Sequence, residues 1–120
     1  TVEPAVLSDV PPQVSISCRE AFGPVVGINS YRDLDEAVEL VNRSEYGLQA
    51  GMYTRDIRKA FDAARRIHVG GFLINEVPQY RADHMPYGGV KMSGYGREGP
   101  RSAIEEMTEQ KSVVFHGVGV

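Results

Sequence analysis

The stretch Arg19-Glu20-Ala21-Phe22-Gly23-Pro24-Val25 defines a turn in the backbone directly before the first strand of the predicted core. Proline fixes its own φ and moves Gly23 away from the helical region, and Gly23 carries no Cβ that would oppose the turn. A carboxylate, Glu20, and an aromatic ring, Phe22, therefore stand two residues apart on a rigid segment. We expect them to face a ligand. The alternative is a solvated Glu20 beside a core-anchoring Phe22.

The residues after this turn alternate between strand and helix patterns. Val25 to Ile28 reads Val-Val-Gly-Ile, a short buried strand that runs on to about Tyr31. Asp33 stands three residues before Glu36, which is the spacing of a capping box, and apolar residues follow on one face. The sequence therefore predicts a helix that starts after Asp33 and stops between residues 42 and 47.

The same alternation continues in the next segment. Leu48 to Tyr53 predicts a second strand, and Thr54 is expected to cap a second helix that runs through Ile67. Gly71 to Asn75 predicts a third strand. The order strand, helix, strand, helix, strand favours a parallel sheet with right-handed crossovers, so the predicted fold class is α/β.

The flanking segments are less regular. Residues 1–17 contain three prolines and predict extended chain rather than helix, and Glu76 to Pro100 is a long loop rich in glycine and proline. A loop of this length in a compact domain usually carries a functional site. Arg101 to Met107 predicts a short helix, and Ser112 to His116 predicts a last strand.

Composition narrows the class of protein. The chain has 120 residues, 42% of them hydrophobic and 24% charged, with a net charge of -3, and this suits one soluble globular unit. Basic residues do not cluster, so we expect no nucleic-acid partner. No apolar run approaches the ~20 residues that span a bilayer, and we expect a cytoplasmic protein without membrane contact. The single cysteine, Cys18, predicts no internal disulfide and no metal site.

A second motif lies further along the chain, and the two motifs together indicate a function. The run Pro86-Tyr87-Gly88-Gly89-Val90-Lys91-Met92-Ser93-Gly94 follows the Glu-Ala-Phe-Gly-Pro turn in the chain. Together the two motifs resemble the C-terminal part of an NAD(P)-dependent aldehyde dehydrogenase. The resemblance implies oxidation of an aldehyde to a carboxylic acid with NAD or NADP. It also implies that Glu20 holds the nicotinamide ribose hydroxyls and that Phe22 packs beside the nicotinamide. A carboxylate is suited to a vicinal diol, because it can accept hydrogen bonds from both hydroxyls.

The resemblance also assigns residues to the substrate side. Tyr87 stands where the family more often has phenylalanine in the wall of the aldehyde pocket, and the alternative is a packed aromatic residue with a solvated hydroxyl. Asn75 ends the third predicted strand before the substrate loop, or else it caps that loop by bonding to backbone. Glu98 matches a family glutamate near the proton path, and the alternative is a surface carboxylate paired with Arg97 or Arg101.

Two features invite a wrong assignment. Gly94 to Gly99 reads Gly-x-Gly-x-x-Gly, yet a loop precedes it where the dinucleotide fingerprint requires a strand, so we do not read it as a phosphate loop. Cys18 lies two residues before Glu20, whereas the family nucleophile lies well upstream of this motif. We expect Cys18 to be a buried or half-buried small side chain.

The resemblance finally predicts what the chain lacks. The dinucleotide-binding domain, the nucleophilic cysteine, the usual general-base glutamate and the oxyanion-hole asparagine are not in this sequence, so we expect an inactive fragment whose partners are the rest of the dehydrogenase chain and an aldehyde. Residues 1–108 would belong to the catalytic domain and 109–120 to an oligomerisation segment, with Lys111 to His116 pairing in a homo-oligomer. The alternative is a non-catalytic module that associates with itself or donates a strand.

Overall fold

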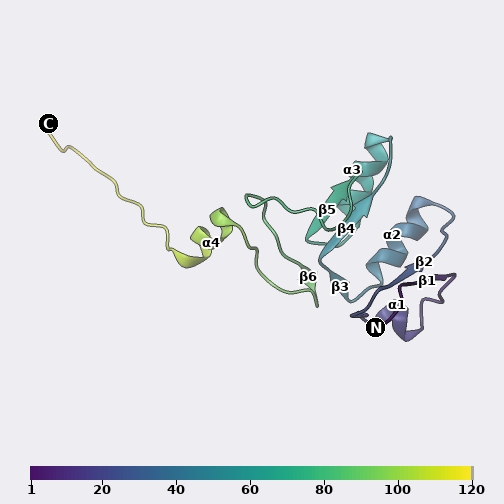
Figure 1. Cartoon of the computed structure of the whole chain (residues 1–120). Helices are drawn as coiled ribbons and strands as arrows, with labels where there is room; N and C mark the ends of the chain where they lie inside the picture. Colours follow the sequence, from purple (N-terminus) through teal and green to yellow (C-terminus); the bar gives the residue numbers. More distant parts are fainter. Residues whose placement is uncertain (120) are drawn as a thin grey trace.

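Short strands and helices alternate along the chain, and the computed structural model describes residues 1–119 (Figure 1). The elements in chain order are β1 (Ala5–Ser8), α1 (Ser15–Cys18), β2 (Val25–Ile28), α2 (Leu34–Asn42), β3 (Tyr46–Gly47), β4 (Gln49–Met52), α3 (Ile57–Arg66), β5 (Gly71–Ile74), β6 (Val90–Lys91) and α4 (Pro100–Met107). The α/β class and the predicted helices at α2, α3 and α4 are confirmed.

The strands form three separate two-stranded sheets rather than one parallel sheet. β1 pairs with β2 in parallel, β4 pairs with β5 in parallel, and β3 pairs with β6 antiparallel. The prediction of one sheet through β2, β4 and β5 is therefore wrong for residues 1–119. The reason is that β2 takes the N-terminal strand β1 as its neighbour, while only β4 and β5 keep the parallel pairing expected across a helix.

Helix α1 corrects the expectation that residues 1–17 contain no helix. It makes a single turn, in which the Arg19 N–H donates to the Ser15 carbonyl at 2.8 Å. The Ser17 hydroxyl and the Cys18 thiol donate to the carbonyls of Pro11 and Pro12, each at 3.0 Å. Pro11 and Pro12 lie outside the helix, and their carbonyls accept the hydrogen bonds that hold the helical turn against them. Helix propensity does not predict such contacts.

The cap of α2 is confirmed and the predicted cap of α3 is wrong. The Asp33 carboxylate accepts a hydrogen bond from the Glu36 N–H at 2.9 Å, as the capping-box spacing predicts. At α3 the cap is Asp56, whose carboxylate accepts from two backbone N–H groups of the first turn. Thr54 instead accepts from the Asp56 N–H at 3.1 Å, so it bends the chain into the cap.

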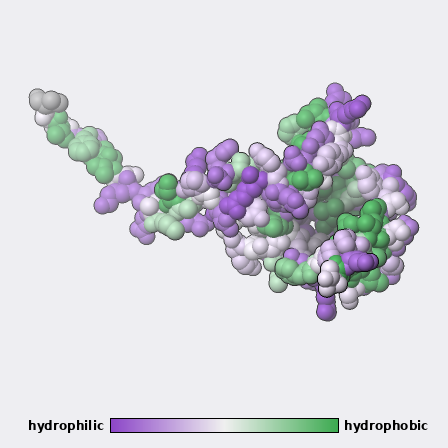
Figure 2. Space-filling model, viewed as in Figure 1, coloured by the Kyte–Doolittle hydropathy of each residue, from purple (hydrophilic) through white to green (hydrophobic). Residues whose placement is uncertain are grey.

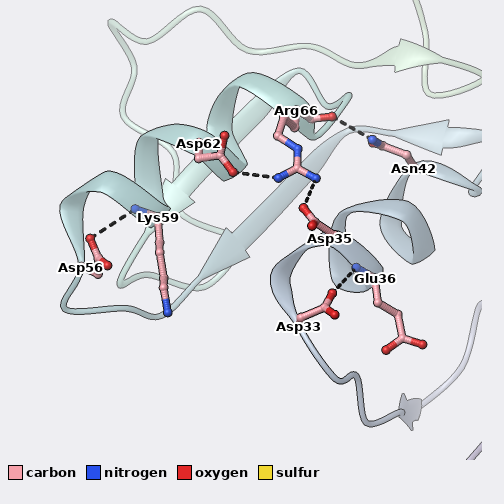
Figure 3. Close-up of polar contacts among 8 residues, drawn as sticks. All are labelled: Asp33, Asp35, Glu36, Asn42, Asp56, Lys59, Asp62 and Arg66. Atoms are coloured by element: carbon pink, nitrogen blue, oxygen red, sulfur yellow. Dashed lines mark hydrogen bonds and ion pairs between the residues drawn. The ribbon is translucent and has the colours of Figure 1, made fainter.

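Arg66 ties α3 to α2 (Figure 3). Its guanidinium pairs with Asp62 on its own helix at 2.8 Å and with Asp35 on α2 at 2.5 Å. The hydrogen bonds that the Arg66 guanidinium donates to Asp62 and Asp35 raise the pKa of Arg66. Asn42, at the end of α2, donates to the Arg66 carbonyl at 2.7 Å. Arg66, the last residue of α3, therefore contacts both the first turn and the last residue of α2.

The chain buries little apolar surface. Among residues 1–119 the buried hydrophobic side chains are those of Val38, Ala60, Ala63 and Leu73. The accessible surface is 10136 Å², whereas a folded monomer of this mass exposes about 6,400 Å². The radius of gyration is 20.2 Å, against about 14 Å for a compact domain of this length. Apolar residues accordingly lie on the outside of the molecule, and Figure 2 shows them in green.

The C-terminal segment runs away from the body after α4 (Figure 1). Residues 108–119 contain no strand, and Val113, Val114 and Phe115 are 65%, 75% and 76% exposed. The strand predicted from Ser112 to His116 is therefore absent within the described chain. It has β propensity but no neighbouring strand to pair with, so the segment does not close a sheet of its own.

Candidate active-site segments

The turn that carries Glu20 and Phe22 is held by two short backbone hydrogen bonds. The Gly23 N–H donates to the Ala21 carbonyl at 2.9 Å, and the Val25 N–H donates to the Gly23 carbonyl at 2.8 Å. Each bond closes a three-residue turn, and Phe22 occupies the centre of the first. The Phe22 side chain is 95% exposed, so it is not the core anchor of the alternative interpretation.

The structure brings the two sequence motifs to one hollow. This hollow has a volume of about 540 Å³, and its lining includes Glu20 from the first motif together with Met92 and Ser93 from the second. The exposed Glu20 forms no hydrogen bond or ion pair with residues 1–119, so its carboxylate oxygens remain available as acceptors. Motifs about seventy residues apart in sequence thus share a surface at which a ligand can be held.

The long loop from Glu76 to Pro100 closes on itself beside Tyr87 and Glu98. The backbones of these two residues form an antiparallel bridge, with N–H to carbonyl distances of 3.0 and 2.6 Å. Arg81 joins them: its guanidinium lies 4.3 Å from the centroid of the Tyr87 ring and its Nη2 lies 2.9 Å from the Glu98 Oε2. Arg81, Tyr87 and Glu98 form a compact group, which we name the Arg81 cluster.

Glu98 differs in two ways from its predicted setting. Its ion-pair partner is Arg81, not Arg97 or Arg101, and its side chain is 66% exposed rather than held in a partly buried pocket. Arg97 instead donates to the carbonyls of Gly89 and Gly96 at 2.9 and 2.7 Å, and Arg101 pairs with a glutamate on its own helix. The sequence does not predict the pairing of Arg81 with Glu98, because an irregular loop separates the two residues.

The loop is fastened to the body through the residues that follow Tyr87. The Lys91 ammonium donates to the carbonyls of Asn42 and Ser44 at 3.1 and 2.9 Å, where α2 ends. A cation at this place binds carbonyls that the helix leaves without partners. Lys91 has φ 57°, and the Ser93 hydroxyl accepts from the Gly47 N–H at 2.9 Å. These contacts were not predicted from the sequence.

Asn75 bonds to backbone, but at the end of β4 and not within the following loop that the capping interpretation names. Its side-chain oxygen accepts from the Thr54 N–H at 2.8 Å, and its own N–H donates to the Met52 carbonyl at 2.7 Å. Its φ of 58° lies in the left-handed region, which asparagine tolerates better than most residues. Asn75 therefore joins the ends of β4 and β5, and its contact with substrate stays a prediction.

The structure also shows the settings of Cys18 and of the glycine-rich run from Gly94 to Gly99. Cys18 is exposed, contrary to the expectation of a buried or half-buried side chain, because α1 lies at the surface. The glycines of the Gly-x-Gly-x-x-Gly run, Gly94, Gly96 and Gly99, have φ values of 125°, 76° and 121°. Their backbone conformation accounts for the glycines without a phosphate.

Residues 1–119 contain no group of three or more His, Cys, Asp or Glu side chains placed to hold a metal ion. In the same residues, every helix is too short or too polar to cross a bilayer.

Curated proteins similar to this chain are aldehyde dehydrogenases. A 3-sulfolactaldehyde dehydrogenase of Priestia aryabhattai is 50% identical over 113 residues, which are 94% of this chain and 24% of that protein. A lactaldehyde dehydrogenase of Methanococcus maripaludis strain C5 is 46% identical over 117 residues, 98% of this chain and 25% of that protein. The chain thus spans about a quarter of the length of the curated relatives that it matches.

Solved structures agree with this relationship. Aldehyde dehydrogenase 21 of Physcomitrella patens, in complex with the reaction product succinate, matches 99% of this chain with 25% of its own, at 44% identity and a TM-score of 0.91. An aldehyde dehydrogenase of Mycobacterium tuberculosis complexed with NAD+ matches 99% of this chain with 24% of its own, at 35% identity and a TM-score of 0.85. The model of the aldehyde dehydrogenase family matches residues 1–113, and the chain belongs to that family.

Proposed function

We propose that this chain is the C-terminal part of an enzyme that oxidises an aldehyde to a carboxylic acid with NAD+ or NADP+. The observation that carries the proposal is the family match over residues 1–113, in which both motifs fall. In this reaction a cysteine thiolate adds to the aldehyde carbon, and water later releases the acid. Cys18 stands outside the family position of that thiolate, so we infer that the chain alone is inactive.

The cofactor side of the site is assigned to Glu20 and Phe22. NAD(P)+ supplies the acceptor for the hydride that leaves the substrate. The free carboxylate of Glu20 suits the two hydroxyls of the nicotinamide ribose, and the exposed ring of Phe22 suits the flat nicotinamide. The turn that holds both residues would orient these groups without rearrangement, because two backbone hydrogen bonds already fix it.

The substrate side is assigned to Tyr87, Asn75 and Glu98. The Tyr87 ring is half-buried and would form part of the wall of the aldehyde pocket. Asn75 would fix the end of β5 next to the substrate loop, and Glu98 would hold or pass a proton at its carboxylate. Relatives named for lactaldehyde and 3-sulfolactaldehyde favour a short hydroxyaldehyde as substrate.

The rest of the dehydrogenase chain is the proposed partner of the exposed surface. The accessible area exceeds the expectation for a compact chain by about 3,700 Å², which is more than the roughly 1,000–2,500 Å² that one partner contributes to most obligate interfaces. Leu34, Ala37 and Val41 of α2 line a hollow of about 900 Å³ that the remaining polypeptide would fill. Residues 111–116 would pair with a second copy in a homo-oligomer, since their edges meet no strand within residues 1–119. The family match favours this enzyme over a non-catalytic module.

The proposal is tested by comparing the complete dehydrogenase with this chain. Each protein is mixed with lactaldehyde and NAD+ or NADP+, and formation of NADH or NADPH is followed by absorbance. We expect turnover by the complete enzyme and none by residues 1–120. Turnover by the isolated chain would contradict the inferred inactivity, and a complete enzyme that oxidises no short aldehyde would contradict the proposed reaction.

A further inference from the structure

Lys91 holds a backbone conformation that its residue type does not favour. Its φ of 57° lies in the left-handed region, where the Cβ crowds the following carbonyl oxygen. The other non-glycine residues with positive φ within residues 1–119 are Asp9 and Asn75, whose short polar side chains can hydrogen-bond locally. Lysine has no side-chain acceptor for such a bond. Contacts with the rest of the molecule must therefore hold Lys91 in this conformation.

The end of α2 supplies these contacts through the Lys91 ammonium. Nζ donates to the carbonyl oxygens of Asn42 and Ser44 at 3.1 and 2.9 Å, and Lys91 is half-buried. Carbonyls at a helix C-terminus carry the negative end of the helix dipole, so a cation is stabilised there. Asn42 is itself fixed, because its side chain donates to the Arg66 carbonyl and accepts from the His68 N–H. The ammonium thus binds a point of the body that α3 also holds.

A β-turn starts at the end of β6 and contains Lys91. The Ser93 N–H donates to the Val90 carbonyl at 3.2 Å, so Lys91 is the second residue of a four-residue turn. A positive φ at this position belongs to the primed turn types, in which glycine, asparagine and aspartate are the usual residues. The direction in which the chain leaves β6 therefore depends on Lys91 keeping its φ.

This turn lies between the two proposed sides of the site. Met92 and Ser93 line the hollow of about 540 Å³ that also contains Glu20, and Tyr87 lies four residues before Lys91 in the chain. The turn that carries Glu20 has backbone hydrogen bonds of its own, and Lys91 takes no part in them. A change at Lys91 would therefore move the loop that contains Tyr87 and leave the cofactor side in place.

We propose that Lys91 is a positioning residue of the dehydrogenase reaction: its ammonium, bound at the end of α2, holds the left-handed turn that sets the Tyr87 loop against the Glu20 side. This inference rests on the proposed function, because it assigns these two sides to aldehyde and cofactor. Hydride transfer needs the aldehyde and the nicotinamide in one fixed geometry, and a misplacement of about 1 Å costs on the order of 100-fold in rate. The effect of Lys91 reaches the reaction through the loop.

The competing explanation is that Lys91 only stabilises the fold. A purely stabilising contact lowers the melting temperature and leaves the kinetics of the folded enzyme unchanged. A positioning contact that works by holding a positive φ slows the folded enzyme when it is lost. Glycine adopts a positive φ without strain, so it should replace this lysine better than alanine does. Alanine and glycine at this one position therefore separate the two explanations.

The experiment compares Lys91→Ala and Lys91→Gly in the complete dehydrogenase with lactaldehyde, well below the melting temperature. We expect kcat/KM to fall about 10- to 100-fold in Lys91→Ala and to stay at least about fivefold higher in Lys91→Gly than in Lys91→Ala. The Kd for NAD+ or NADP+ should change less than about twofold in both variants, because the Glu20 turn is held independently.

Lys59→Ala is the control, because it removes an ammonium from an exposed side chain of α3. We expect this control to leave kcat/KM unchanged. Three results would each overturn the inference: unchanged kcat/KM in Lys91→Ala, equal losses in Lys91→Ala and Lys91→Gly, or cofactor binding that weakens as much as kcat/KM falls.

Hydrogen exchange gives a second readout that needs no turnover. The Met92 N–H donates to the Glu45 carbonyl at 3.0 Å, and in Lys91→Ala it should exchange at least about 10-fold faster, while the turn that carries Glu20 exchanges at an unchanged rate. Unchanged exchange at Met92 would overturn the inference, and equally faster exchange at both places would show a general loss of stability instead of lost positioning. An enzyme that oxidises no aldehyde would contradict the proposed function, and the exchange measurement would still decide the role of Lys91.

Discussion

Replacing Gly70 by alanine should displace the substrate loop by a predictable amount. A Cβ at Gly70 would overlap the carbonyl oxygen of Gly88 and lie 2.7 Å from its carbonyl carbon. Non-bonded carbon atoms settle at about 3.5–4.0 Å, so the Gly88 carbonyl carbon has to move by at least about 1 Å and its oxygen by more. Gly88 follows Tyr87 directly, and the pocket wall would move with it. A misplacement of about 1 Å costs on the order of 100-fold in rate, and overpacking costs about 1–3 kcal/mol of stability.

The assay for this variant is kcat/KM of the complete dehydrogenase, measured by absorbance of the reduced cofactor, together with thermal unfolding. Gly27→Ala is the control, because its Cβ would meet only the Val10 Cγ2 at an ordinary 3.7 Å. We expect kcat/KM to fall about 100-fold in Gly70→Ala and less than about threefold in Gly27→Ala. If Gly70→Ala folds and keeps kcat/KM within twofold of the unmodified enzyme, the close approach of β5 and the substrate loop does not position Tyr87.

Three further predictions concern the cofactor, pH and assembly. Glu20→Gln and Phe22→Ala should each raise KM for NAD+ or NADP+ about 10-fold in the complete enzyme with little change in melting temperature, since both side chains are exposed; unchanged KM values would remove them from the cofactor site. The pKa of Glu36 lies below its ordinary value of 4.5, chiefly because its carboxylate accepts a hydrogen bond from the Arg32 backbone N–H. This contribution to stability is complete above pH 4.5 and is lost as the pH falls through the lowered pKa, so Glu36→Gln should flatten the acid limb of stability in urea unfolding; an identical acid limb would contradict the assignment. Deletion of residues 109–120 should lower the oligomeric state in sedimentation if that segment pairs between copies, and an unaltered oligomer would exclude this pairing.

Local signals predicted helices α2, α3 and α4, but not α1 or the cap of α3. The Asp33 and Glu36 spacing located the start of α2, because a cap is a contact between residues three apart and is written directly in the sequence. The sheets were predicted less well, since strand pairing joins distant residues. The pattern from Val25 to Ile28 shows that β2 is a strand, but nothing in it indicates that β1 is its neighbour.

In the candidate site, too, local features could be predicted and contacts between distant residues could not. Glu20 and Phe22 were predicted as candidates because a Gly-Pro turn fixes the backbone beside them, and their contact with the cofactor stays a prediction. The partner of Glu98 could not be found, because Arg81 lies 17 residues away through a loop without a repeating pattern. Composition suits a globular unit of this length, whereas the area that the chain leaves exposed can be measured only in three dimensions.

The most direct test of the central claim is the intact mass of the native protein captured from its source cells with an antibody against this chain. We expect a polypeptide about four times the 13.2 kDa of these residues, because the chain spans about a quarter of the length of its relatives. A native product of 13.2 kDa would contradict the claim that these residues complete the site of a larger dehydrogenase chain.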